Sequence, residues 1–191
     1  MSVESDEPSP ARTPGSYDVQ PEAPHLSTID VWHEVVDDAA IWARFNQRFA
    51  FKANYYERSR PAIRLDPGCL VIDLAPICSG SPARCAADED RLEQAAFQAF
   101  ADLAGDGEIF AIDWQHPTYR YSPRVQVDAN TGYATSVFPD GDYYAHMPAD
   151  LAWGTFGHPW QQTLTLWGGE LIATLGADLL TWLPKHDQSR V

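Results

Sequence analysis

The region between Ile109 and Trp167 most constrains the fold, because it divides into short aromatic segments separated by turn residues. Segments of this kind are typical of strands. We predict strands at residues 109–114, 119–127, 133–138, 143–147, 153–156 and 163–167. The turn Pro139-Asp140-Gly141-Asp142 lies between two of them and predicts an antiparallel hairpin, in which Gly141 takes a backbone conformation that is costly for other residues.

Apolar residues at helical spacing predict three helices around this region. The first follows a capping-box pair, Ser27 and Asp30. Its apolar positions are Trp32, Val35, Ala39, Trp42, Phe45 and Phe49. The second begins at the acidic run 88–90 and ends at Gly105, and the third follows Gly168 and Gly169. With one more strand at 70–74, this order predicts an α+β fold, in which about three helices pack on one face of a mainly antiparallel sheet.

The chain has 191 residues, of which 45% are hydrophobic, and this is enough for one core and too few for two ordinary domains. Residues 1–27 hold five prolines and almost nothing apolar, so we expect a disordered acidic tail followed by a single α+β domain at 28–191. The start lacks the features of a signal peptide, and the three cysteines lack the spacing of a zinc site or a disulfide framework. We therefore expect a cytoplasmic protein.

The formal net charge of -14 narrows the classes of partner. Nucleic acids and anionic membranes attract Lys and Arg, of which the chain has 13 against 27 acidic residues, so neither is an expected partner. The same charge speeds encounter with a basic partner. A basic protein or a small molecule is the partner class that remains, and the oligomeric state is left open.

Two His-Pro pairs, His116-Pro117 and His158-Pro159, are the candidate catalytic positions. A following proline holds each histidine in an extended conformation, and we expect both at strand ends. Such an imidazole could act as a general acid or base, with Asp113 or Asp142 orienting it. Equally, each histidine could donate a hydrogen bond that ties a loop to the sheet.

Twelve aromatic residues but only two basic ones lie between Ile109 and Trp167. Because neighbouring side chains on a strand face opposite sides, some rings belong on a second face or at an edge, where they favour a binding surface. The alternative is that helices cover both faces and the rings form cores. The expected ligand- or partner-binding residues are Trp114, Tyr119, Arg120, Arg124, Tyr143, Tyr144 and Trp160.

Asp140, Asp142 and His146 offer oxygen and nitrogen ligands, but their spacing matches no metal-binding loop. The two acids could instead satisfy turn amides. No dinucleotide or phosphate-binding glycine motif is present. We therefore expect neither a metal site nor a cofactor.

Several strings resemble the bacterial domain of unknown function 2716 family, over about residues 32–180. They are Trp42, Arg48-Phe49-x-Phe51, Asp113-Trp114-Gln115-His116-Pro117, Pro139-Asp140-Gly141-Asp142 and Phe156-Gly157-His158-Pro159-Trp160. The resemblance implies no assigned activity, but it emphasises the two His clusters and the Asp-Gly-Asp turn. The chain departs from the family pattern at Arg124, His146 and Gln161, which stand where a His, an apolar residue and a Glu are usual.

Two functional interpretations follow. The first is an interaction protein, similar to a toxin-neutralising immunity protein, that offers an aromatic and acidic surface to a basic partner. The second is a small-molecule enzyme, in which His116 and His158 converge on a pocket walled by Trp114, Tyr119, Tyr143 and Trp160, and Arg120 or Arg124 holds an anionic group. The enzyme interpretation predicts that the two imidazoles converge in one site, and the interaction-protein interpretation does not require it.

Overall fold

The computed structural model describes residues 31–53 and 61–187 of this chain. Within these residues, seven strands form one sheet in the order β1-β4-β3-β5-β6-β7-β2, and every neighbouring pair is antiparallel. The strands are β1 (Trp32–Glu34), β2 (Leu70–Asp73), β3 (Ile109–Asp113), β4 (Tyr119–Tyr121), β5 (Tyr144–Met147), β6 (Gly154–His158) and β7 (Thr163–Trp167). The predicted tail at 1–27 and the capping pair lie outside the described residues.

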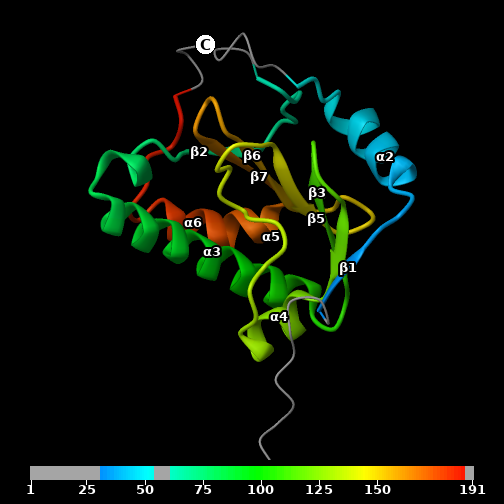
Figure 1. Cartoon of the computed structure of the whole chain (residues 1–191). Coiled ribbons are helices and arrows are strands. Elements are labelled where there is room, and N and C mark those ends of the chain that lie inside the picture. Colours follow the sequence, from blue (N-terminus) through cyan, green and yellow to red (C-terminus); the bar gives the residue numbers. More distant parts are fainter. Residues whose placement is uncertain (1–30, 54–60, 188–191) are drawn as a thin grey trace, which may run out of the picture.

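Helices cover both faces of this sheet (Figure 1). They are α2 (Ala39–Phe49), α3 (Pro82–Ala104), α4 (Pro123–Ala129), α5 (Gly169–Leu171) and α6 (Ala177–Leu179), and a π-helical stretch (Ile172–Gly176) joins the last two. The α+β prediction is confirmed, but the prediction that the helices share one face is wrong, because α2 packs opposite α3. None of the described helices has the length and apolar character needed to cross a bilayer.

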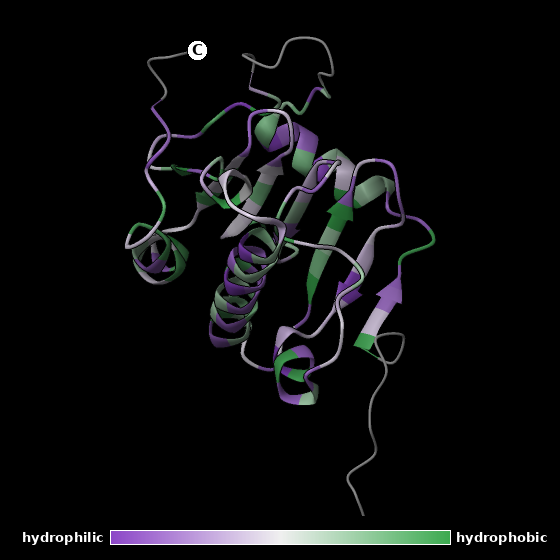
Figure 2. Ribbon diagram, turned by 60° about the vertical axis from the view of Figure 1, so that its left-hand side comes forward, coloured by the Kyte–Doolittle hydropathy of each residue, from purple (hydrophilic) through white to green (hydrophobic). Residues whose placement is uncertain are grey.

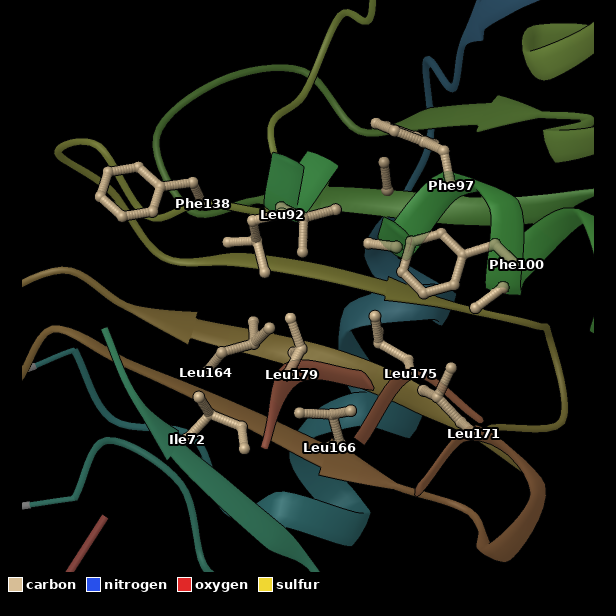
Figure 3. Close-up of a cluster of buried hydrophobic side chains, with 14 of the residues drawn as sticks. Ile72, Leu92, Phe97, Phe100, Phe138, Leu164, Leu166, Leu171, Leu175 and Leu179 are labelled. Atoms are coloured by element: carbon tan, nitrogen blue, oxygen red, sulfur yellow. The ribbon is translucent and has the colours of Figure 1, made fainter. Parts of the chain in front are cut away.

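The side of the sheet that α3 and the C-terminal helices cover is called the α3 face. Figure 3 shows Leu92, Phe97 and Phe100 of α3 above the strands, with leucines of the C-terminal helices completing the layer. The strand residues Ile72, Leu164 and Leu166 point into the same cluster, and all three are buried. Burial of these apolar side chains supplies the main drive for packing this layer.

The opposite side, called the α2 face, has a core of aromatic rings. Phe45 and Phe49 of α2 are fully buried, and the ring centroid of Phe49 lies 4.6 Å from that of Trp167. The Trp167 indole Nε1 donates to the carbonyl oxygen of Leu151 at 2.9 Å. Phe156 lies against Phe45, so α2 is held on the sheet by ring contacts.

Capping residues mark both ends of α3. The helix begins at Pro82, about two turns before the start that the acidic run 88–90 had predicted. Ser81 caps the start, because its hydroxyl oxygen accepts from the backbone N–H of Arg84, and Pro82 occupies the first turn. Gly105 ends the helix with a φ of 56°, as predicted. Figure 2 shows hydrophilic and hydrophobic residues alternating along α3, so one side faces the core and the other faces solvent.

The predicted first helix is too long, because Trp32 lies in strand β1 and α2 begins only at Ala39. The Trp32 ring stacks on Tyr121 with centroids 3.8 Å apart, and its Nε1 donates to Gln126 Oε1 at 2.6 Å. Val35 likewise precedes the helix, and its backbone N–H donates to Thr118 O. Helical spacing alone does not distinguish these positions from a strand that pairs with β4.

Two predicted strands in the middle of the chain are also wrong. The segment 119–127 splits into β4 and α4, because Ser122 caps a helix that Pro123 opens. The segment 133–138 forms no strand, and the backbone N–H groups of Val137 and Phe138 donate to the Glu93 carboxylate instead. The predicted hairpin is therefore absent, and Gly141 has no positive φ and would hold a Cβ without contact.

The two edge strands of the sheet, β1 and β2, are either short or covered. The C-terminal segment runs along β2, where Asp73 N donates to Pro184 O at 2.9 Å and His186 N donates to Val71 O at 2.8 Å. Ile72 and Lys185 form an isolated antiparallel bridge. At the other end, β1 is only three residues long.

Candidate functional site

The pairing of β3 with β5 brings two distant aspartates together. Asp113 lies opposite Tyr144 in the register, so its carboxylate meets that of Asp142, just before β5. The His116 Nδ1 lies 3.0 Å from Asp113 Oδ1 and 3.6 Å from Asp142 Oδ2. We call these three residues the Asp–His–Asp cluster.

Both aspartates of this cluster are buried, whereas the His116 side chain is 62% exposed. The hydrogen bond to Asp113, followed by the negative charges of Asp113 and Asp142, raises the pKa of His116. Burial, followed by the charge of Asp113, raises the pKa of Asp142. An exposed imidazole held by a buried carboxylate can act as an acid or base, as the sequence suggested.

The same three side chains each offer one ligand atom, and these atoms lie within 4.8 Å of one another. Two carboxylates and an imidazole can bind a divalent cation. The sequence had pointed instead to Asp140, Asp142 and His146 as the nearest candidates. The structure therefore places a ligand set where no spacing in the sequence predicted one.

His146 lies on the α3 face and serves the core. It is fully buried, with Nδ1 2.9 Å from the Tyr121 hydroxyl and Nε2 3.0 Å from Ser136 O. Burial lowers the pKa of His146 to about 4, so the ring is neutral at pH 7. Its nitrogens join strand β5 to Tyr121 of β4 and to Ser136 in the segment between α4 and β5, and they are not directed at Asp140 or Asp142.

His158 lies on the α2 face, where it lines a cavity of about 280 Å³. The ring is buried, its Nδ1 accepts from the Gln161 backbone N–H at 3.1 Å, and its centroid lies 5.0 Å from that of Tyr143. The cavity, here called the His158 cavity, is lined by Pro61, Ala62, Ile63, Leu65, Val71, Phe156, His158, Gln161, Thr163, Thr165 and His186.

His116 is not part of that lining, and His158 is not part of the Asp–His–Asp cluster. The predicted convergence of the two imidazoles in one site is therefore not what the structure shows. Each histidine belongs to a separate site, because Asp113 and Asp142 hold His116 while the strand β6 turns His158 towards the α2 face.

A third site lies between α3 and the segment that follows α4. Two adjoining hollows, of about 390 and 140 Å³, share Asp90, Glu93 and Tyr133 in their walls. The remaining lining residues are Ala86, Glu89, Gln94, Phe97, Gln98, Gln126, Val127, Asn130, Thr131, Ser136, Phe138 and Asp140. We call the pair of hollows the acidic groove.

Glu93 forms the buried base of the groove. Its carboxylate accepts from the backbone N–H groups of Val137 and Phe138 and from the Ser136 hydroxyl, at 2.9, 2.7 and 2.5 Å. Burial raises the pKa of Glu93 against the effect of these hydrogen bonds. The carboxylate thereby fixes the loop that forms the far wall.

The acidic groups of this surface act on one another. Burial and the charges of Asp140 and Asp90 raise the pKa of Glu89. Burial, then Glu93 and the neighbouring acids, raises the pKa of Tyr133 to about 12. Asp140 also accepts from the Tyr144 hydroxyl at 2.6 Å and contributes to the raised pKa of His116. Asp140 thus joins the groove to the Asp–His–Asp cluster.

Among the described residues, no Lys or Arg lines either hollow of the groove. The arginines of α3 point elsewhere, because Arg84 pairs with Asp88 at 3.5 Å and the Arg91 guanidinium lies over the Trp182 ring at 4.3 Å. Arg124 reaches Asp102 and the carbonyl oxygen of Ala101. The negative charge of the groove is therefore not neutralised by basic side chains in the described part of the chain.

The residues expected to bind a partner have different roles. Trp114, Tyr143 and Trp160 make ring contacts on the α2 face, where Tyr143 is buried between its neighbours. Tyr119 lies against Trp32. Arg120 pairs with Glu108 at 3.2 Å and Arg124 with Asp102 at 4.0 Å, and neither arginine is among the described residues that line the His158 cavity.

Tyr144 meets the acidic groove through the hydrogen bond that its hydroxyl donates to Asp140. Sequence reasoning missed Glu89 and Asp90 as site residues, although the acidic run 88–90 was visible and was assigned to a helix start. Tyr133 is 42% exposed, which fits the expectation that some rings lie outside the cores. Most of the other rings fill the cores of the two faces, as the alternative interpretation held.

Comparison with known proteins confirms the resemblance seen in the sequence. Residues 34–172 match the family described as "Protein of unknown function (DUF2716)". The chain is similar to an uncharacterized protein, YxiI, of Bacillus subtilis (strain 168), with 36% identity over 90 residues. That match covers 46% of this chain and 56% of the relative, so the chain spans about half the length of the curated relative it matches. No solved structure matches.

Proposed function

The chain belongs to the DUF2716 family, and we propose that it is a binding protein whose acidic groove takes a basic segment of a partner protein. The observation that carries this proposal is the lining of the groove. Glu89, Asp90, Glu93 and Asp140 gather along one side of α3, and no described Lys or Arg lines the hollows with them.

The groove offers Lys and Arg side chains an aromatic ring and hydrogen-bond acceptors as well as negative charge. Tyr133 offers a half-exposed ring, over which a guanidinium can stack. Gln94 and Gln98 supply amide oxygens that accept hydrogen bonds from the same donors. The groove follows α3, so an extended segment can place successive basic side chains against successive turns of the helix.

The ionic strength determines how far each charge acts on a bound partner. At physiological ionic strength charges more than about 8 Å apart are largely screened from each other. The net charge of -14 therefore steers a basic partner towards the protein, and the acids that contact the bound segment determine how long it stays. A basic toxin neutralised by an immunity-type protein is one partner of this chemistry.

The proposal is tested by NMR titration of the full chain with a hexa-arginine peptide at about 150 mM salt. The expected result is a set of amide shifts concentrated at Glu89, Asp90, Tyr133 and Asp140. The triple variant Glu89→Gln, Asp90→Asn, Asp140→Asn is expected to weaken binding at least about tenfold.

The control is a second triple variant, Glu34→Gln, Asp106→Asn, Glu170→Gln, which removes the same charge at exposed positions outside the groove. It should weaken binding by less than about twofold. If both triple variants weaken binding equally, or if the shifts spread over the whole surface, binding reflects net charge alone and the proposal fails.

One observation favours a second candidate function, which is acid–base catalysis at His116. Its exposed ring is held by a buried carboxylate 3.0 Å away, an arrangement found where an imidazole transfers protons. Turnover of a panel of nitrophenyl esters and phosphates tests it. His116→Gln should abolish any activity found, while His33→Gln, at another exposed histidine, should not. Equal rates in the two variants would exclude this role.

A further inference from the structure

We infer that the His158 cavity is a binding site for a small amphipathic molecule whose polar end carries a carboxylate. The cavity lies on the α2 face, away from the acidic groove, and it is bounded by β6, β7, β2 and the segment 61–65. The inference is thus independent of the proposed function, which concerns the opposite face.

The part of β7 that forms the base of the cavity carries polar side chains, although buried strand positions are ordinarily apolar. Along β7, the residues Thr163, Thr165 and Trp167 alternate towards the α2 face. Trp167 packs on Phe49 in the aromatic core, but the two threonines, 2% and 4% exposed, line the cavity. Valine has nearly the same shape as threonine, so packing alone does not require hydroxyl groups here.

Those hydroxyl groups are available to a ligand. Among the described residues, no side-chain hydrogen bond joins Thr163 Oγ1 or Thr165 Oγ1 to a protein atom, although buried polar groups are generally satisfied. His158 lies beside them, and because its Nδ1 accepts from Gln161 N, the neutral ring carries its proton on Nε2. The base therefore brings together two hydroxyl groups that can donate hydrogen bonds, with the His158 ring beside them.

The charge of the lining selects the polar end of the ligand. No acidic residue lies among the described lining residues, although acids outnumber basic residues 27 to 13 in the chain. Two imidazoles, an amide and two hydroxyls line the cavity instead. This set is rich in donors, and the carboxylate is the common small group that accepts from several donors at once.

The size and the remaining walls select the rest of the molecule. Pro61, Ile63 and Leu65 form one wall and Val71 and Phe156 another, so most of the surface is apolar. A volume of about 280 Å³ lies near the lower end of the range for ligand pockets. A compact apolar body with one carboxylate fits this description.

The test uses isothermal titration calorimetry and NMR on the full chain, with 3-phenylpropanoate as the probe and its uncharged amide as the matched comparison. We expect the carboxylate to bind, with amide shifts at residues 156–165, and the neutral amide to bind at least about tenfold more weakly. Thr165→Val should weaken binding of the carboxylate by about tenfold, because it removes a donor and keeps the shape.

Thr155→Val is the matched control, since Thr155 lies one strand away on the α3 face and does not line the cavity. It should leave the affinity unchanged. The inference is overturned if 3-phenylpropanoate does not bind at about 10 mM, if its amide binds equally well, or if Thr165→Val and Thr155→Val have the same effect. Shifts confined to the acidic groove would also overturn it.

Discussion

The two faces of the sheet stabilise the protein by different chemistry. On the α3 face, buried titratable groups are part of the core, including Glu93, His146 and Tyr121. On the α2 face, the core is made of rings such as Phe45, Phe49 and Trp167, and the polar groups are gathered in the His158 cavity. The difference implies that acid acts on the α3 core through its buried carboxyl and imidazole groups, whereas the aromatic rings that hold α2 on the sheet carry no charge.

The two faces also differ in the ligands that they suit. The α3 side carries acids, which suit a basic partner, whereas the cavity on the α2 side carries hydrogen-bond donors, which suit an acceptor. Because residues alternate along each strand, one sheet presents both surfaces with little interference between them.

The largest expected effect is on the α2 face. Phe49→Ala should lower the free energy of unfolding by about 4 kcal/mol, because it removes a fully buried ring and leaves a cavity beside Trp167. Urea unfolding measures this loss, which should be equal at pH 7 and pH 5. A loss that depends on pH would show that the α2 face is coupled to titrating groups.

On the α3 face, acid should destabilise the protein through His146. The pKa of His146 is about 4 in the folded state, and the ordinary imidazole value of 6.5 applies to the unfolded chain. The unfolded chain therefore takes up the proton first as pH falls. The stability contributed above pH 6.5 is therefore lost as pH falls towards 4, by about 3 kcal/mol for this difference in pKa.

The control for this prediction is His146→Leu, which removes the titrating ring. It should be less stable at pH 7, since the Tyr121 hydroxyl and Ser136 O lose their partner, but its stability should fall less between pH 6.5 and pH 4.5. Glu93 has a raised pKa and acts with the opposite sign, so the difference between the two proteins isolates His146. Parallel pH curves would contradict the assignment.

A smaller effect is expected from removing one hydroxyl group on each face. Thr155 Oγ1 on the α3 face is buried without a hydrogen-bond partner in the described structure, so Thr155→Val should raise the free energy of unfolding by about 1 kcal/mol. Thr165→Val should change it by less than about 0.5 kcal/mol, because its hydroxyl faces the cavity. Equal gains from both variants would argue against an open cavity at Thr165.

The smallest effect on stability is expected at the exposed His116, where the informative measurement is its pKa. Asp113→Asn should lower that pKa towards the ordinary value, because the charge and the hydrogen bond acceptor that raise it are weakened. The ion pair is present below the ordinary pKa of imidazole and is lost as pH rises through the raised value. NMR titration of the ring resolves the shift, and Glu108→Gln, at the far end of β3, should leave it unchanged.

The sequence predicted the parts of the fold that depend on periodicity. Strand β7 at Thr163–Trp167 agrees with the predicted residues, and the end of α3 at Gly105 was marked by its chemistry. Short elements with few periods were missed, and α4 is the clearest case, since Val125 and Val127 continue the alternation of Tyr119 and Tyr121 in the preceding strand. Trp32 was predicted in a helix although it lies in β1, because a buried tryptophan fits the apolar side of either element.

The candidate sites depended on contacts between distant residues, which one sequence does not reveal. Asp113 and Asp142 were both named, but only the β3–β5 register shows that they hold the same imidazole. The groove needs α3 to lie against residues 130–140, of which 133–138 were predicted to be a strand and Pro139 and Asp140 part of a turn. The hydrogen bonds that Glu93 accepts create that wall, and no local pattern signals them.

The pairing of residues 184–186 with β2 affects how copies of this protein meet. An uncovered strand edge offers its backbone groups to another chain, which allows edge-to-edge aggregation. Here Pro184 and His186 bond to the outward backbone groups of Asp73 and Val71, and Pro184 has no N–H to donate. With β1 only three residues long, growth of the sheet from one molecule into the next is disfavoured at both ends.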